Sequence, residues 1–177
     1  MKCRLELECM AMFRVTFLLL CLALLSCVGI DQRLANIPQE RRTLFLGNFG
    51  NVTFEPDLQI ELTEALRNYI HLRKGYILVD EIEKARFLLY GEVILYRREG
   101  FLFDNEMNPT RYDLNIVAKI RLIERETGNM VATFDEDART QYSTKEGMAE
   151  DEVIARQRLY GKLCRKIYDR ISMAFPL

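Results

Sequence analysis

The residue types that most often perform enzyme chemistry are scarce in this sequence of 177 residues. Its one histidine, His71, has no neighbours at metal-ligand spacing, so we expect a solvated side chain there. A glycine-rich phosphate loop, a G-x-S-x-G turn and a Cys-x-x-Cys pair are all missing. Glu81, Glu83 and the acidic run at 150–152 fall in expected turns or at a helix start, where solvated carboxylates are the ordinary case. The sequence therefore predicts a protein that is not an enzyme and has no cofactor or metal site.

Cysteine chemistry points instead to lipid attachment. Residues 15–25 form an apolar run that is too short to span a bilayer core of about 30 Å. Arg14 precedes this run and Ser26 follows it, which is the order of a secretory signal peptide. The sequence LLSC at 24–27 resembles a bacterial lipobox, in which the cysteine is acylated and becomes the first mature residue. We predict that Cys27 carries palmitate-type acyl chains; the alternatives are an ordinary signal peptide or an uncleaved helix.

This prediction divides the chain into three parts. They are a signal peptide at 1–26, a lipidated tether at 27–41 and a single α+β domain at 42–177. Two acidic residues near the N-terminus are unusual in a signal peptide, so translation could also start at Met10 or Met12.

After cleavage and acylation, Cys164 would be the one remaining free thiol, so we expect no disulfide. We expect Cys164 to act as a small apolar residue on a helix. The net charge of the whole chain is −1, which gives no indication of nucleic-acid binding.

Four basic residues could bind phosphate groups. Arg97 and Arg98 end one expected strand, and Lys119 and Arg121 project from the strand that should pair with it. Guanidinium and ammonium groups form charge-assisted hydrogen bonds to phosphate oxygens. Ordinary polar decoration of a strand is the alternative interpretation of the same residues.

Phe101, Leu102 and Phe103 form the second candidate contact site. They fall in an expected hairpin loop at 99–110, where three successive apolar residues are unusual unless they touch something. Folding back onto the core is the alternative.

A pattern of period two places these residues on strands. At 112–122 every second residue is apolar, and the residues between are mostly polar, which is typical of a strand with one buried face. At 87–98 we expect Phe87, Leu89, Val93 and Leu95 on one face and Tyr90, Glu92, Tyr96 and Arg98 on the other. Together the two runs predict a long antiparallel hairpin.

The other elements are added to this hairpin. We expect a strand at 43–49, a helix starting near Pro56, a short strand at 76–79, a long strand at 130–142 and a helix at 150–175. Val153, Tyr160, Ile167 and Ala174 recur along one stripe of the last helix, and Ser143 with Glu146 could form a capping box before it. The order predicts an α+β two-layer sandwich, with two helices on one face of a mixed, mostly antiparallel four- to five-stranded sheet.

Several segments, taken in order, resemble one known family. NFGNVTFEPDLQIELTEAL is similar to that family's strand end, N-x-T turn and first helix, with matches at Asn51, Thr53, Leu58, Leu62 and Leu66. ARFLLYGEVILYRREG is similar to its next strand, with matches at Ala85, Leu89, Gly91, Val93 and Tyr96, although Arg86 stands where the family usually has Asp. RYDLNIVAKIRLIERETGNMV is similar to the following strand and its Thr-Gly turn. The family is the lipopolysaccharide-assembly lipoprotein LptE.

The resemblance implies a non-catalytic lipoprotein of the outer membrane. Such a protein would sit as a plug inside an LptD-type β-barrel, help that barrel assemble and contact lipopolysaccharide during its transport to the outer leaflet. It would be anchored through Cys27, facing the periplasm or the barrel lumen, and would bind no nucleic acid. The four basic residues then become lipopolysaccharide-contact candidates, and the apolar triplet at 101–103 becomes the partner-contact candidate.

A different exported lipoprotein of similar fold is the alternative. An activator of a peptidoglycan synthase, for example, would be a protein-docking module without glycolipid contact. Co-purification of a barrel or of a synthase separates the two.

Overall fold

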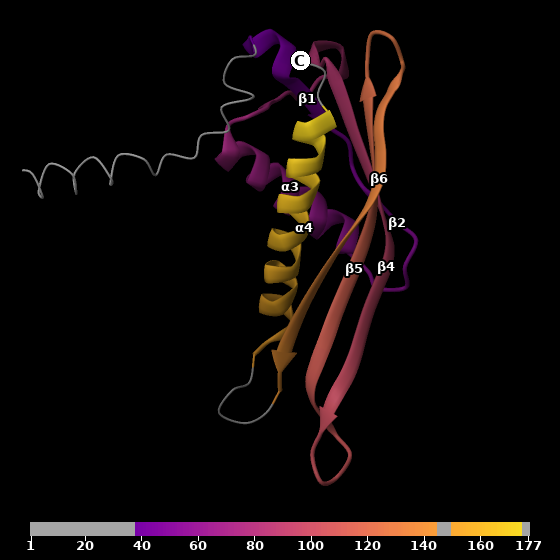
Figure 1. Cartoon of the computed structure of the whole chain (residues 1–177), viewed down its shortest axis with the longest axis vertical. Coiled ribbons are helices and arrows are strands. Elements are labelled where there is room, and N and C mark those ends of the chain that lie inside the picture. The colour runs from indigo at the N-terminus through magenta and orange to yellow at the C-terminus, as the bar shows by residue number, and fades with distance from the viewer. Residues whose placement is uncertain (1–37, 145–149, 175–177) are drawn as a thin grey trace, which may run out of the picture. The chain divides into compact units, whose positions relative to one another are not determined.

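A long antiparallel hairpin forms the middle of the sheet, as the alternating pattern predicts. The computed structural model describes residues 38–144 and 150–174, shown in Figure 1. Strand β4 (Phe87–Phe103) pairs with β5 (Pro109–Glu124), and β5 pairs in turn with β6 (Met130–Ser143), both in antiparallel register. Gly128, with φ of 68°, forms the predicted turn between β5 and β6.

Three short strands complete the sheet on the other side of β4. Strand β1 (Thr43–Leu46) and then β2 (Gly50–Asn51) run parallel to β4, and β3 (Ile77–Leu78) runs parallel to β1. The order is β3-β1-β4-β5-β6, with β2 also beside β4. The predicted α+β fold is confirmed. Within residues 38–144 and 150–174 the sheet has six strands rather than four to five, because a two-residue strand such as β2 leaves no periodic pattern.

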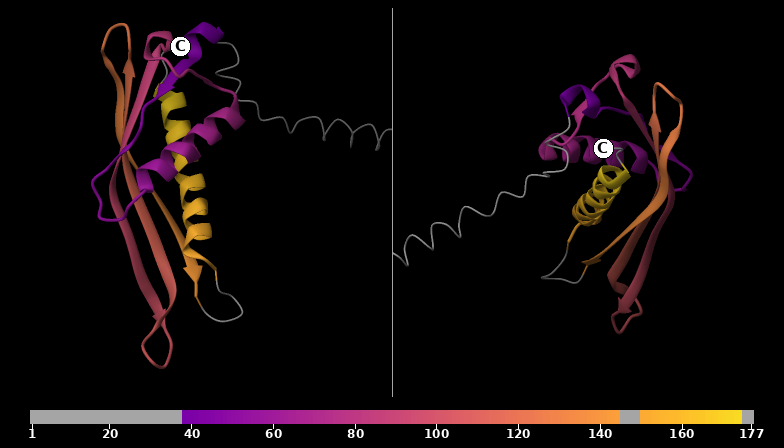
Figure 2. Two further views of the ribbon diagram at one scale, coloured as in Figure 1. Left: turned by 180° about the vertical axis from the view of Figure 1, so that it is seen from behind. Right: turned by 45° about the horizontal axis from the view of Figure 1, so that its top comes forward.

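The two α-helices of the described residues cover the same face of the sheet (Figure 2). Helix α3 (Leu58–Arg73) packs against α4 (Glu152–Ala174), and α4 lies mainly over β6 and β5. Two short 3-10 helices, Gln39–Arg42 and Ile82–Lys84, precede β1 and β4. The core between the layers contains these fully buried side chains, among others: Leu44, Leu62, Leu66, Phe87, Leu89, Leu114, Ile116, Ile120, Leu159, Leu163 and Ile167. Burying each such side chain stabilises the fold by about 1.5–3 kcal/mol.

The helix starts differ from the predicted ones. Helix α3 begins at Leu58, two residues after Pro56, because Asp57 adopts φ of 65° and its carbonyl accepts the first amide hydrogen bonds of the helix. At α4, Asp151 Oδ1 accepts a hydrogen bond from Val153 N at 3.0 Å and so acts as the cap. The predicted capping box with Ser143 requires Glu146, which lies outside the described residues.

Helix α4 also buries a different stripe from the predicted one at its start. Val153 is 50% exposed, and the buried stripe begins at Ala155. Cys164 is buried in this stripe, as expected, and burial raises the pKa of its thiol to about 12. His71 is exposed in the last turn of α3, also as expected.

One irregularity in β4 overturns part of the predicted alternation. The register with β5 shifts between Val93 and Leu95, which is the signature of a β-bulge. An extra residue in a strand turns every later side chain to the opposite face, so Tyr96 moves to the helix-covered face and Leu95 leaves it. The prediction that Leu95 lies with Phe87, and Tyr96 opposite, was wrong for this reason.

The predicted hairpin loop at 99–110 was too long. Strand β4 continues through Phe103, and only Asp104 to Asn108 connect it to β5. The Asp104 carboxylate closes this turn by accepting hydrogen bonds from the amides of Glu106 and Asn108, both at 2.9 Å. Extended chain can carry apolar side chains outside a core, so the apolar character of 101–103 did not require a loop.

Candidate functional site

Arg97 and Arg98 are successive strand residues and so point to opposite faces of the sheet, and the bulge in β4 decides which of them faces the helices. Arg98 lies opposite Leu114 of β5, whose side chain is buried under the helices. Arg97 lies opposite Asn115, on the face of the sheet that no described helix covers, called the uncovered face below. Directly opposed residues in an antiparallel pair point to the same face of the sheet. Arg97 and Arg98 therefore cannot act as a single paired cation site.

Lys119 and Arg121 share the uncovered face with Arg97 but lie farther along it. Lys119 lies in register between Glu92 of β4 and Asp135 of β6, so an acidic residue occupies the paired position on each neighbouring strand. Asn115, the partner of Arg97, precedes Lys119 by four residues, or about 13 Å at about 3.3 Å per strand residue. The predicted cluster of four cations is thus a row of three along one face, with Arg98 on the other.

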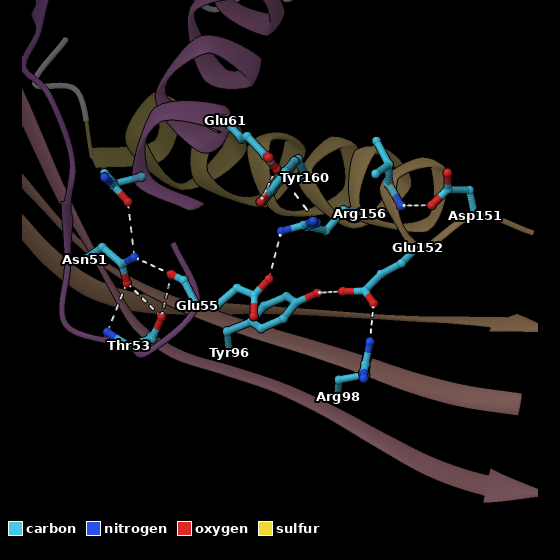
Figure 3. A network of polar contacts seen from close by, with 12 residues as sticks. Asn51, Thr53, Glu55, Glu61, Tyr96, Arg98, Asp151, Glu152, Arg156 and Tyr160 are labelled. Atoms are coloured by element: carbon cyan, nitrogen blue, oxygen red, sulfur yellow. Dashed lines mark hydrogen bonds and ion pairs between the residues drawn. The ribbon is translucent and has the colours of Figure 1, made fainter. Parts of the chain in front are cut away.

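Arg98 belongs to a polar network centred on Glu152, at the start of α4 (Figure 3). Arg98 Nη1 donates to Glu152 Oε2 at 2.6 Å, and Tyr96 Oη donates to Glu152 Oε1 at 3.0 Å. Tyr142 Oη of β6 donates to Glu152 Oε2 at 3.2 Å. The Arg98 guanidinium also lies over the Tyr112 ring, at 5.2 Å from its centroid. One carboxylate therefore joins β4, β6 and the first turn of α4.

The electrostatics of this network favour an ionised Glu152. Burial by itself would raise the pKa of this carboxyl, but the hydrogen bonds from Arg98 and Tyr96 outweigh burial and lower the pKa. Burial and the neighbouring Glu152 charge raise the pKa of Tyr142 to about 12, so its phenol stays protonated as a donor. The predicted solvated role of Glu152 was wrong, because its side chain is only 20% exposed.

A second group of charges continues the network toward α3. Arg156 Nη1 donates to Glu55 Oε1 at 3.3 Å, and its Nε lies 3.9 Å from Glu61 Oε2. Tyr160 Oη donates to Glu61 Oε2 at 2.8 Å. These contacts join α4 to the first turn of α3 and to the loop before it (Figure 3).

The N-x-T turn positions Glu55. Asn51 Oδ1 accepts hydrogen bonds from Thr53 N at 2.9 Å and from Thr53 Oγ1 at 2.8 Å. Asn51 Nδ2 donates to the Glu55 carbonyl at 2.7 Å and to Gln59 Oε1 at 3.1 Å. A single amide side chain thus ties β2 to the loop and to α3.

A polar hollow of about 330 Å³ lies within the network, lined by Glu55, Tyr96, Arg98, Glu152 and Arg156. Its two carboxylates are each paired with an arginine. Within the described residues, no group of three or more His, Cys, Asp or Glu side chains could hold a metal ion. Tyr96 and Arg98 both donate to Glu152, and Arg156 donates to Glu55, so the side chains that line the hollow join the strands to helix α4 and to the loop before α3.

Sequence reasoning missed this network because its members are far apart in the chain. Arg98 and Glu152 are 54 positions apart, and Glu55 and Arg156 are 101 apart. The alternation at 87–98 placed Tyr96 and Arg98 on the opposite face of the strand, so local periodicity gave no signal for these contacts.

The apolar triplet lies at the far end of the hairpin. Phe101, Leu102 and Phe103 are 38%, 46% and 49% exposed. Pairing between β5 and β6 ends at Arg111 and Ser143, so this end of the hairpin extends past β6 as two strands (Figure 1). The structure brings the three residues together at the hairpin end and away from the core.

A comparison with protein families gives a match over most of the chain. The LptE model, described as lipopolysaccharide-assembly, matches residues 41–171. The chain belongs to the LptE family. It is therefore an LptE-like lipoprotein of a non-catalytic family, and family membership associates it with lipopolysaccharide assembly and with the outer membrane. Among curated proteins, none matches.

Solved structures similar to this LptE-family chain support the fold. The hypothetical protein CT253 from Chlamydia trachomatis has a TM-score of 0.56 and 12% identity, covering 73% of this chain and 95% of that one. Protein XCC0632 from Xanthomonas campestris has a TM-score of 0.57 and 9% identity, covering 75% of this chain and 84% of that one. At such low identity the likeness concerns the arrangement of strands and helices alone.

The described residues give limited information on how this LptE-family chain is attached to a membrane. Within the described ranges, no helix is long and apolar enough to cross a bilayer. The predicted signal peptide, Cys27 and most of the tether lie outside the described residues, so acylation of Cys27 stays a prediction.

Proposed function

We propose that this chain is the outer-membrane lipoprotein that plugs the lumen of an LptD-type β-barrel. In this role it helps the barrel assemble and assists the transport of lipopolysaccharide to the outer leaflet. Acylation of Cys27 anchors the chain to the outer membrane, from which the domain reaches the barrel from the periplasmic side. Membership of the LptE family is the observation that carries the proposal.

The hairpin end supports a protein-contact role. It presents Phe101, Leu102 and Phe103 on a two-stranded extension that no described helix covers. The Asp104 side chain accepts two hydrogen bonds from the turn beyond them, which restricts that turn and so lowers the entropy lost when a partner binds. Burying one such aromatic ring against a barrel wall contributes about 1.5–3 kcal/mol. We propose that this triplet contacts the barrel.

The uncovered face of the sheet supports a glycolipid-contact role. Arg97, Lys119 and Arg121 are all exposed on this face. Beside them, Leu95 and Val117 are partly exposed, so the face combines cations with apolar surface. Lipopolysaccharide presents phosphates next to acyl chains, which is a complementary chemistry. Arg98 is the weakest of the four original candidates, because Glu152 already holds its guanidinium.

Co-purification tests the proposal. The full chain, tagged at its C-terminus, is isolated from detergent-solubilised outer membrane, and we expect a large β-barrel protein to accompany it. Phe101→Ser with Phe103→Ser should reduce the recovered barrel severalfold without lowering the melting temperature. The matched control is Leu72→Ser with Met173→Ser, which removes two exposed apolar side chains from the helices.

Two results would contradict the proposal. One is recovery of a peptidoglycan synthase in place of a barrel, which would support the alternative docking-module function. The other is equal loss of the barrel in the control variant, which would show that the hairpin end has no special role.

A further inference from the structure

Helix α4 covers the β6 edge of the sheet, whereas part of the outer edge of β4 has no described partner strand. At the β6 edge, three basic side chains from successive turns of α4 donate to backbone carbonyls. Lys166 Nζ reaches the Asp137 carbonyl at 2.7 Å, Lys162 Nζ the Arg139 carbonyl at 2.9 Å, and Arg158 Nη2 the Gln141 carbonyl at 2.8 Å. The carbonyls belong to alternate residues, which are the ones that point away from β5. Helix α4 thus blocks this edge against another strand.

The β4 edge has no such cover along part of its length. Strand β2 ends beside Val93, where Val52 N donates to the Val93 carbonyl at 3.0 Å. Beyond that point, β4 pairs with β5 on one side and with no described strand on the other (Figure 1). Register irregularities after Val93 and after Gly100 bound a regular stretch between them. The stretch from Tyr96 to Gly100 is the open edge.

Successive residues of a strand direct their backbone N–H and C=O groups to alternate sides, so only every second residue of the open edge can pair with a further strand. The Val93 carbonyl points away from β5, and the bulge carries this orientation to Tyr96, Arg98 and Gly100. Among the described residues, no backbone hydrogen bond fills these three positions from the open side. Unpaired groups in a row are a template for strand addition.

We propose that this open edge pairs antiparallel with the same edge of a second copy of this chain. The sequence of the edge is self-complementary when Arg98 lies opposite Arg98 of the second copy. Arg97 then lies opposite Glu99 of the second copy, and Glu99 opposite its Arg97, which gives two pairs of opposite charge. The same register makes Tyr96 and Gly100 hydrogen-bonded partners, for about six backbone hydrogen bonds in all.

The two opposed Arg98 residues do not repel across this dimer. In each copy, Arg98 Nη1 donates a hydrogen bond to Glu152 Oε2 of the same chain at 2.6 Å, so each guanidinium has its own counter-ion. Arg97 and Glu99 lie two positions apart on β4, and Arg97 Nε is 3.4 Å from Glu99 Oε1. Their side chains are 57% and 62% exposed, so each can exchange its partner within the chain for the opposite charge of the second copy. Gly100 leaves room beside Tyr96 of the second copy, because it has no side chain.

The pairing has a closed two-fold symmetry, so it ends at a dimer. It does not depend on the proposed barrel partner, and it gives the chain a way to satisfy an open edge before it meets another protein.

Charge reversal tests the register. The full-length lipidated chain is purified in detergent, and its protein mass is measured by light scattering over a range of concentrations. Arg97→Glu alone, or Glu99→Arg alone, puts like charges opposite each other at both pairs and should weaken the dimer roughly tenfold. Arg97→Glu with Glu99→Arg restores opposite charges and should return the dissociation constant to within about threefold of the original value. A monomeric wild-type chain, or a double variant as weak as the single ones, would overturn the proposal.

Disulfide trapping in cells provides a second, independent readout. Two differently tagged full-length chains are co-expressed, one with Arg97→Cys and the other with Glu99→Cys, and disulfide-linked pairs are counted on a non-reducing gel. We expect severalfold more linked pairs than from either variant alone. The matched control places Asp137→Cys and Arg139→Cys at the blocked β6 edge, where we expect none above background. Equal linkage at the two edges, or linkage of the Arg97→Cys chain to a different protein instead, would rule out the self-pairing.

Discussion

The ring of Phe49 lies directly on the backbone of Gly91. A Cβ atom built on Gly91 would overlap the edge of the Phe49 ring, closer than real Cβ contacts allow. Phe49 is only 5% exposed, so its ring cannot move aside without disturbing the core. Gly91 therefore gives the loop after β1 its place against β4.

Gly91→Ala should destabilise the domain by about 1–3 kcal/mol, because the added methyl group overpacks this contact. Chemical denaturation followed by circular dichroism measures the change. Gly161→Ala in α4 is the matched control, because nothing lies within 4 Å of its added Cβ. Alanine in a helix interior should raise stability by about 0.5–1 kcal/mol. Equal effects at the two positions would contradict the Phe49 contact.

Asn51→Ala should loosen the loop that carries Glu55. The substitution removes four side-chain hydrogen bonds to Thr53, Glu55 and Gln59. We expect a loss of about 1–3 kcal/mol and faster hydrogen exchange at the Thr53 amide. Asn68→Ala, on the exposed side of α3, is the control and should leave both readings unchanged. Unchanged exchange at Thr53 in the Asn51 variant would count against this role.

The stability of the domain should depend on the ionisation of Glu152. Its pKa in the folded protein is lowered from the usual 4.5, so the folded state favours the carboxylate. The resulting stabilisation is present above pH 4.5 and is lost as the pH falls through the lower folded pKa. Glu152→Gln should therefore flatten the acid side of the pH–stability curve and lower stability near neutral pH. Glu64→Gln on the exposed face of α3 is the control, and identical acid profiles for the two variants would refute the assignment.

Glycolipid binding should depend on the uncovered face. Arg97→Gln with Lys119→Gln should weaken binding of lipopolysaccharide by roughly tenfold at low salt, and less at high salt, because exposed charge interactions are screened. Arg98→Gln should instead lower the melting temperature, since it breaks the contact with Glu152. Fluorescence titration with labelled lipopolysaccharide measures the first effect. Stronger loss of binding from Arg98→Gln than from the double variant would reverse this assignment.

Cys27→Ala should abolish acylation. A fatty-acid probe supplied to cells should label the wild-type chain, and the variant should carry no label. A single acyl chain gives only marginal anchoring, so several chains on one cysteine are needed for stable attachment. Cys164→Ala is the control, because that thiol is buried in α4. Labelling that persists in the Cys27 variant would end the lipoprotein-anchor prediction.

Local patterns were sufficient for most of the fold. The alternation at 112–122 predicted β5 and its buried face, because a strand places every second side chain on the same side. The helical spacing after Pro56 predicted α3 to within two residues, and the turn at Gly128 followed from its residue types. The family resemblance, argued from ordered short segments, agreed with the family match over 41–171.

The candidate sites were less predictable, because their geometry depends on contacts between distant residues. The sequence by itself determined that Arg97 and Arg98 end a strand and that an apolar triplet follows them. Only the tertiary structure decided that a bulge after Val93 turns Arg98 toward Glu152 and leaves Arg97 on the open face. A bulge satisfies packing between whole strands and leaves little trace in local periodicity. The partner of Arg98 is 54 positions away, so no spacing rule within a strand or helix could identify it.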